Sequence, residues 1–155
     1  MNFTDTKALS EKQKLEIIEL WNREYPKGLS LAGLVEFEKY LDDLLEKNHL
    51  LLSDENGSVK GWLICFIRDH ERCFAMLLDS SLQGQGFGSR FLTLAKERYS
   101  ELNGWVIDND NEPKQNGEKY KSPIEFYRKN SFEILGDIEL KKKNINGIRV
   151  VWKKK

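Results

Sequence analysis

The sequence predicts one α/β (or α+β) domain with a mixed sheet that helices cover on both faces. The expected elements follow the order ααβββαβαββ, and two of the strands are apolar on both faces. In addition, one strand is followed by a glycine-rich turn, a helix and another strand, and this unit implies a crossover between parallel strands. The chain of 155 residues suits one core, so we expect residues 1–155 to form a single domain.

The first third of the chain is expected to be mostly helical. Apolar residues at helical spacing predict a helix over 10–24, with Ser10 as its N-cap. The proline and glycine of YPKGLS (25–30) end this helix. A second amphipathic helix is expected over 31–47.

Three strands are expected next, over 49–54, 58–68 and 71–79. They are separated by DENG, which favours a turn, and by RDHE, which is short enough for a tight hairpin. The apolar residues of the middle strand fall into two alternating sets, which are Trp62, Ile64 and Phe66 on one face and Leu63, Cys65 and Ile67 on the other. Strands that are apolar on both faces are typical of a sheet covered on both sides.

The second half of the chain alternates helices and strands. We expect a helix over 86–101, a strand over 103–110, a polar loop over 111–121, a short helix over 122–130, and a hairpin of 132–142 and 148–153 that turns at NING. In the short helix, Ser122 is the expected N-cap, Pro123 fits the first turn and Glu125 completes a capping box. Asn130 is expected to end it in the left-handed conformation.

Composition and charge exclude several classes of protein. Lys+Arg and Asp+Glu both number 25, so no global field attracts nucleic acid or a membrane. No apolar run approaches the length of a membrane span, and the polar N-terminus does not resemble a signal peptide. We expect a cytoplasmic protein whose Cys65 and Cys73 are reduced. These cysteines, His49 and His70 show no metal-ligand spacing, so no metal site is expected.

The stretch LQGQGFGSRF places Gly84, Gly86 and Gly88 between a strand and a helix. Glycines there let backbone N–H groups approach a phosphate at the helix N-terminus. The dinucleotide fingerprint needs a glycine where Ser89 stands, and the P-loop needs GKS or GKT where this chain has GSR. A tight strand-to-helix turn without a ligand remains the alternative interpretation.

The pattern QGQGFG (83–88) fits Q/R-x-x-G-x-G/A and resembles the pyrophosphate loop of the GNAT superfamily of N-acetyltransferases. MLLDSSLQGQGFGSRFLTLAKER (76–98) resembles motif A of that family, and SPIEFYRKNSFEIL (122–135) resembles its motif B. The resemblance implies the GNAT fold, with a mostly antiparallel twisted sheet, and acetyl-CoA as cosubstrate. The residues that it implies for cofactor binding are Met76, Leu77, Leu78, Gln83, Gly84, Gln85, Gly86, Phe87, Gly88, Ser89 and Ser122.

The resemblance also implies a mechanism, in which an amine attacks the thioester directly in a ternary complex. Tyr127 would protonate the departing thiolate as general acid, and the alternative is a core residue with its hydroxyl at the edge. Where family members have an early asparagine in motif B, this chain has Tyr120, and where several have a glutamate as base it has Arg72. Glu71 and Asp108 are the remaining candidates for the base.

The acceptor site is implied to come from segments 23–30 and 109–121, and the acceptor is expected to be an amine of a small molecule or a protein. Asp108, Asp110 and Glu112 could attract a cationic amine, or the loop could simply be solvated. We expect no nucleic-acid or membrane partner, while a homodimer is possible. Two alternatives remain, namely a non-catalytic acyl-CoA-binding module and another nucleotide-binding α/β protein.

Overall fold

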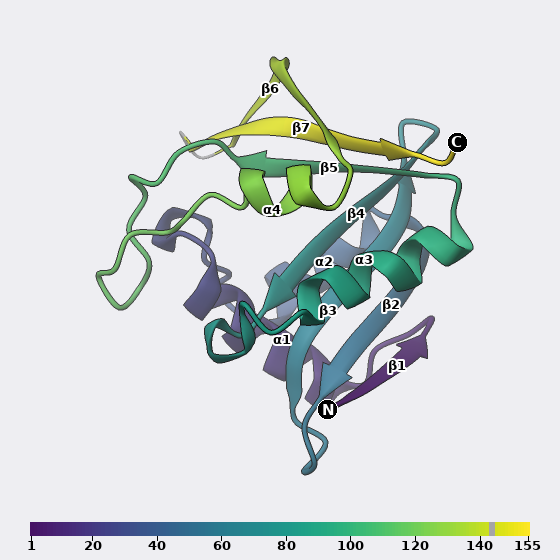
Figure 1. The fold of residues 1–155 in the computed structure, drawn as a ribbon. Helices are drawn as coiled ribbons and strands as arrows, with labels where there is room; N and C mark the ends of the chain where they lie inside the picture. Colours follow the sequence, from purple (N-terminus) through teal and green to yellow (C-terminus); the bar gives the residue numbers. More distant parts are fainter. Residues whose placement is uncertain (143–144) are drawn as a thin grey trace.

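Seven strands form one sheet in the order β1-β2-β3-β4-β5-β7-β6 (Figure 1). The computed structural model describes residues 1–142 and 145–155. The strands are β1 (Asn2–Thr6), β2 (Leu45–Ser53), β3 (Val59–Arg68), β4 (Glu71–Leu78), β5 (Glu101–Ile107), β6 (Glu133–Lys142) and β7 (Ile145–Lys153). The helices are α1 (Glu11–Glu24), α2 (Leu34–Asp42), α3 (Phe87–Arg98) and α4 (Ile124–Lys129), with 3₁₀ turns η1 (Lys27–Leu29) and η2 (Ser80–Leu82). Only β4 and β5 pair in parallel, so the predicted mixed, mostly antiparallel sheet is confirmed.

Helices cover both faces of this sheet, as the apolar alternation predicts. Residues of α1 and α2 share a buried cluster with Trp62, Ile64 and Phe66 of β3. Residues of α3 and α4 pack with Leu63 and Cys65 on the opposite face. The two buried clusters therefore use alternate residues of the same strand, and the predicted two-sided core is confirmed.

The second helix is shorter than predicted, because α2 ends at Asp42 rather than near residue 47. The chain turns through Glu46, whose φ is 47°, and the following residues pair with β3. The ammonium of Lys47 donates hydrogen bonds to the carbonyls of Leu41 (2.9 Å) and Leu44 (3.0 Å) at this turn. Pairing along the sheet thus overrides the helical spacing of the apolar residues.

One strand is absent from the prediction, and two strands have other bounds than predicted. β1 was not predicted, because a polar five-residue strand carries little periodicity; Phe3 nevertheless packs edge-on against Phe91 at 5.0 Å between ring centroids. β5 runs over 101–107 rather than 103–110. β7 begins at Ile145, so most of NING belongs to the strand; residues 143 and 144, where the predicted turn falls in part, lie outside the described residues.

A buried histidine in β2 gives the fold a specific pH dependence. His49 is 1% exposed, and its Nδ1 accepts a hydrogen bond from the indole N–H of Trp62 at 3.0 Å. Burial lowers the pKa of His49 from 6.5 to about 4, with Lys47 and Lys14 adding to the effect. Protonation would also break the bond to Trp62, so the folded protein keeps this imidazole neutral.

We expect this group to destabilise the protein as the pH falls from 6.5 to 4. Between these pH values the unfolded chain binds a proton at His49 that the folded chain does not bind. The free energy of unfolding therefore falls by about 3 kcal/mol at the lower end. The measurement is chemical denaturation against pH for the wild type and for His49→Gln. The variant should lack the part of the pH dependence that His49 contributes. His70→Asn, in the exposed β3–β4 turn, is the control. Equal pH slopes for wild type and His49→Gln would contradict the assignment.

The two parallel strands at the centre of the sheet separate toward their C-terminal ends. β4 and β5 share one bridge, between Cys73 and Asn103, and Figure 1 shows them diverging beyond it. On the other side of β4, the N–H of Asp79 donates to Lys60 of β3 at 2.9 Å. Because successive backbone groups alternate in direction, the N–H and C=O groups of Met76 and Leu78 face the gap.

Candidate active site

The glycine stretch forms the turn between β4 and α3. Gly84 and Gly86 have φ angles of +76° and +88°, in the left-handed region that glycine adopts most readily. Gly86 is the N-cap of α3, and its position leaves N–H groups of the first helical turn without intrahelical partners. A Cβ at Gly88 would lie 2.9 Å from the ring of Phe126, so this glycine allows α4 to pack closely on α3. The loop is thus shaped to present backbone N–H groups at a helix N-terminus.

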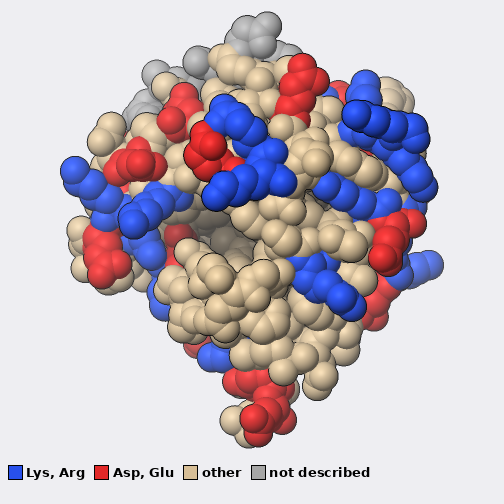
Figure 2. Space-filling view, viewed as in Figure 1, with Lys and Arg blue, Asp and Glu red and all other residues tan. Residues whose placement is uncertain are grey.

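A cavity of about 530 Å³ lies between this loop, the free edge of β4 and the start of α4; we refer to it as the glycine-loop cavity. Its lining includes ten of the residues singled out in the sequence, which are Met76, Leu77, Leu78, Gln83, Gly84, Gly86, Gly88, Ser89, Ser122 and Tyr127. Two others do not line it: the Gln85 side chain donates to Ser81, and Phe87 packs into the core. Figure 2 shows a hollow on this face with Lys and Arg side chains along its upper and left rim, which suits an anionic ligand.

Tyr127 lies at the inner end of this cavity. Its side chain is 5% exposed and contacts the rings of Phe74, Phe126 and Phe132. Burial raises the pKa of Tyr127, and Tyr120 adds to the shift, so the phenol keeps its proton at neutral pH. No hydrogen bond occupies the Tyr127 hydroxyl within the described part of the chain, which leaves it available to a ligand.

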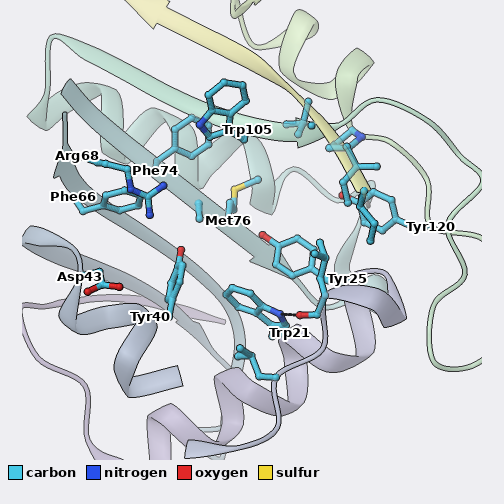
Figure 3. A pocket seen from close by; sticks show the side chains of 18 of the residues that line it. Trp21, Tyr25, Tyr40, Asp43, Phe66, Arg68, Phe74, Met76, Trp105 and Tyr120 are labelled. Atoms are coloured by element: carbon cyan, nitrogen blue, oxygen red, sulfur yellow. Dashed lines mark hydrogen bonds between the residues drawn. The ribbon is translucent and has the colours of Figure 1, made fainter. Parts of the chain in front are cut away.

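A second cavity, of about 470 Å³, lies on the other side of the gap between β4 and β5 (Figure 3). Eight aromatic residues contribute to its lining, and we refer to it as the aromatic cavity. They are Trp21, Tyr25, Tyr40, Phe66, Phe74, Trp105, Tyr120 and Tyr127. Five residues line both cavities, which are Tyr25, Met76, Tyr120, Pro123 and Tyr127. The two cavities therefore meet where the free edge of β4 passes Tyr127.

Two of these shared residues come from the segments that the sequence associates with an acceptor. Tyr25 follows the end of α1, and Tyr120 ends the polar loop. Burial raises the pKa of both phenols well above the usual value. Each is the single tyrosine of a mostly polar segment, and that is the signal that could have singled them out.

A buried carboxylate, which the sequence did not reveal, holds these segments together. Glu24 is 6% exposed and lines the glycine-loop cavity. It accepts a hydrogen bond from the N–H of Ser80 (2.9 Å) and lies 3.5 Å from both the Lys114 ammonium and the Arg23 guanidinium. Glu24 thus ties α1 to the end of β4 and to the polar loop.

The two candidate bases lie apart from both cavities. Glu71, at the start of β4, pairs with Arg149 beside Asn103. Asp108 is exposed just after β5, where its carboxylate accepts a hydrogen bond from Asn109. Neither residue lines the space around Met76 and Tyr127.

The prediction is wrong at both ends of α4: Pro123 is the N-cap, no side chain caps the helix, and Glu125 pairs with Arg128 instead of completing a capping box. Ser122 does not cap the helix: its hydroxyl donates to the carbonyl of Ile107, its N–H donates to Asp110 (2.7 Å), and the helix begins at Ile124. Asn130 keeps a negative φ, and Ser131 adopts the left-handed conformation instead, with a φ of 70°. Ser122 is thus committed to joining the loop to β5.

Over residues 1–142 and 145–155, no group of three or more His, Cys, Asp or Glu side chains is arranged to hold a metal ion. No helix in the same residues is long and apolar enough to cross a membrane.

Comparisons with known proteins define the class to which this fold and site belong. Solved structures of the same fold include an aminoglycoside 6'-acetyltransferase type Ii, with a TM-score of 0.68, 16% identity and coverage of 99% of this chain and 97% of that one. A GNAT superfamily phosphinothricin acetyltransferase from Sinorhizobium meliloti, in complex with AcCoA, has a TM-score of 0.67, 15% identity and coverage of 99% and 89%. A spermidine N-acetyltransferase mutant from Vibrio cholerae has a TM-score of 0.65, 12% identity and coverage of 99% and 95%. No curated protein matches the chain by sequence.

The family model described as "Acetyltransferase (GNAT) family" matches residues 14–132. This chain therefore belongs to the GNAT acetyltransferase family. It is an N-acetyltransferase with acetyl-CoA as its cosubstrate, as the sequence predicts. The predicted GNAT fold is confirmed as well.

Proposed function

We propose that this enzyme moves the acetyl group of acetyl-CoA directly to the amine of a small molecule in a ternary complex. The observation that carries the proposal is the junction of the two cavities at Met76 and Tyr127. Acetyl-CoA would occupy the glycine-loop cavity, with its pyrophosphate at the N-terminus of α3 and its pantetheine arm along the edge of β4. The amine would enter through the aromatic cavity and meet the thioester at the junction.

The acetyl transfer forms one bond and breaks another. The amine nitrogen bonds to the thioester carbon, the carbon–sulfur bond breaks, and the sulfur leaves as a thiolate. An N–H group on the free edge of β4, from Met76 or Leu78, would stabilise the charge on the carbonyl oxygen. Tyr127 would give its proton to the sulfur, because burial disfavours the thiolate. The proton from nitrogen would leave to solvent, with no side chain assigned to it, and Tyr127 would regain a proton from solvent before the next turnover.

The size of the aromatic cavity supports a small-molecule acceptor over a protein. Its volume of about 470 Å³ lies in the range of small-molecule sites, and residues of α1, α2, β3, β4, β5 and β7 line it. Three structural relatives are named for small acceptors, namely an aminoglycoside, phosphinothricin and spermidine. That the present chain also acetylates a small molecule is part of the proposal.

We expect acetyl-CoA, but not ATP or NAD, to stabilise the purified protein. At about 100 times Kd, a ligand that binds only the folded state adds about 2.7 kcal/mol, which raises Tm by several degrees. Thermal denaturation with each compound makes the measurement, and an amine screen for release of CoA thiol follows. Absence of a shift at saturating acetyl-CoA would contradict the proposed donor site.

The non-catalytic acyl-CoA-binding module that the sequence left open does not agree with the family assignment. The absence of Glu71 and Asp108 from both cavities instead leaves the general base without an assigned side chain. The single-domain extent over 1–155, the cytoplasmic location and a homodimer stay predictions.

A further inference from the structure

The aromatic cavity has two chemically different ends. Met76, Tyr120 and Tyr127 mark the inner end, where the cavity meets the donor site. Figure 3 shows Arg68 and Asp43 together at the opposite end, far from Tyr120. In the strand register, Arg68 of β3 lies opposite Glu71 of β4. Glu71 precedes Met76 by five residues, which corresponds to about 16 Å along the strand. An acceptor that fills the cavity is therefore elongated.

The space between the two ends is apolar. Phe66, Phe74 and Trp105 line it from three neighbouring strands, and Tyr40 lines it from α2. Trp105 is 38% exposed, although it is one of the largest apolar side chains of the protein. A flat aromatic or apolar body would cover these rings and gain the free energy of burial.

The outer end carries a positive charge for which the described residues provide no carboxylate partner. The guanidinium of Arg68 lies 5.2 Å from the centroid of the Phe66 ring, and it forms no ion pair with any described carboxylate. Most arginines elsewhere are paired; for example, Arg23 pairs with Asp79 and Arg149 pairs with Glu71. A guanidinium that lies over a ring keeps N–H groups available at its edge, and two of these match the two oxygens of a carboxylate.

The acidic residues of this cavity offer a weaker site for a cation. A carboxylate oxygen of Glu36 already accepts a hydrogen bond from the N–H of Ala32 at 2.7 Å. Asp43 is exposed at the end of α2, where Lys39 lies one turn before it on the same helix and also lines the cavity. Lys39 and Arg68 face Glu36 and Asp43 in the lining, so these four charges balance and the case for an anion rests on the guanidinium of Arg68.

We propose that the acceptor of this enzyme is an amine with an aromatic or apolar body and a carboxylate at the end remote from the amine. Arg68 binds the carboxylate and thereby sets the specificity, while the apolar body covers Phe74 and Trp105. The inference rests on the proposed function, because it places the amine at Met76 and Tyr127. It also predicts that the amine and the carboxylate stand at opposite ends of the body, rather than on one carbon.

Three amines with one body test this specificity with the purified enzyme and acetyl-CoA. They are 4'-(aminomethyl)biphenyl-4-acetate, its primary amide and 4,4'-bis(aminomethyl)biphenyl, whose two rings make the body long enough to reach from the junction toward Arg68. We expect kcat/KM for the carboxylate to exceed that for the amide by about 10–100-fold, the usual range for a charge-assisted pair. Arg68→Gln should remove this preference, mainly through KM. Asp43→Asn, at the same end with the opposite charge, should keep it.

A binding measurement makes the test independent of turnover. Calorimetry with 4-methylphenylacetate, which has no amine, should show binding to the wild type in the presence of CoA and about tenfold weaker binding to Arg68→Gln. Equal binding to both proteins, or no binding to either, overturns the proposal. A preference for the diamine that Asp43→Asn abolishes overturns it in favour of a cationic acceptor. Binding of 4-methylphenylacetate without turnover of any amine would instead contradict the proposed function.

Discussion

Replacing Tyr127 with phenylalanine is expected to lower kcat by about 10²–10⁴-fold, the range for loss of a general acid. The ring stays in place among Phe74, Phe126 and Phe132, because only the hydroxyl is removed. That hydroxyl has no hydrogen-bond partner among the described residues, so the free energy of unfolding should change little. Steady-state kinetics with a saturating amine, together with the acetyl-CoA thermal shift, make the measurement.

Tyr120→Phe is the matched control, because Tyr120 is a second buried phenol that lines both cavities. If Tyr127 is the acid, Tyr120→Phe keeps most of the wild-type kcat. The reverse result, with the large loss in Tyr120→Phe, would move the acid to the polar loop. An unchanged kcat in both variants would mean that the thiolate takes its proton from water.

Gly86→Ala is expected to weaken acetyl-CoA binding by about tenfold or more. Its φ of +88° is strained for an L-residue, and no protein atom lies within 4 Å of the new Cβ. The methyl group would therefore enter the open space at the N-terminus of α3, beside the glycine-loop cavity. Calorimetric titration with acetyl-CoA makes the measurement.

Gly57→Ala separates the backbone strain from the ligand effect. Gly57 has a φ of +78° and equally open surroundings, but it lies in the β2–β3 turn and lines neither cavity. Both variants should lose about 1 kcal/mol of folding free energy, and only Gly86→Ala should lose affinity. Equal affinities for the two variants would contradict the assignment of the pyrophosphate to this loop.

The features that the sequence predicts well are those with local causes. Ser10 is the N-cap of α1 as predicted, because the N–H of Gln13 that it accepts from lies within one turn. The glycines at 84 and 86 are required by local φ angles, and the two-sided strand β3 shows its burial in its own alternation. In contrast, the end of α2 depends on pairing between β2 and β3, which the helical spacing of its apolar residues does not reveal.

The cavities were less predictable because they join parts of the chain that are distant in sequence. Arg68 was interpreted as part of a hairpin turn, and only the pairing of β3 with β4 places it at the outer end of the aromatic cavity. Glu71 is a candidate base only as the neighbour of Arg72, which stands where several family members have a glutamate, and its carboxylate is paired with Arg149 of β7. Spacing along one strand could not reveal a partner 78 residues away.

The single bridge between Cys73 and Asn103 has a consequence for cooperativity. It divides the sheet into a block of four strands and a block of three, whose direct backbone pairing is limited to this bridge. The blocks are otherwise joined by side chains, such as the Phe74 ring that fills the space above Gly104. A pantetheine arm lying in the gap would link the two blocks. Bound acetyl-CoA would therefore help to determine whether the two blocks unfold as one unit or in sequence.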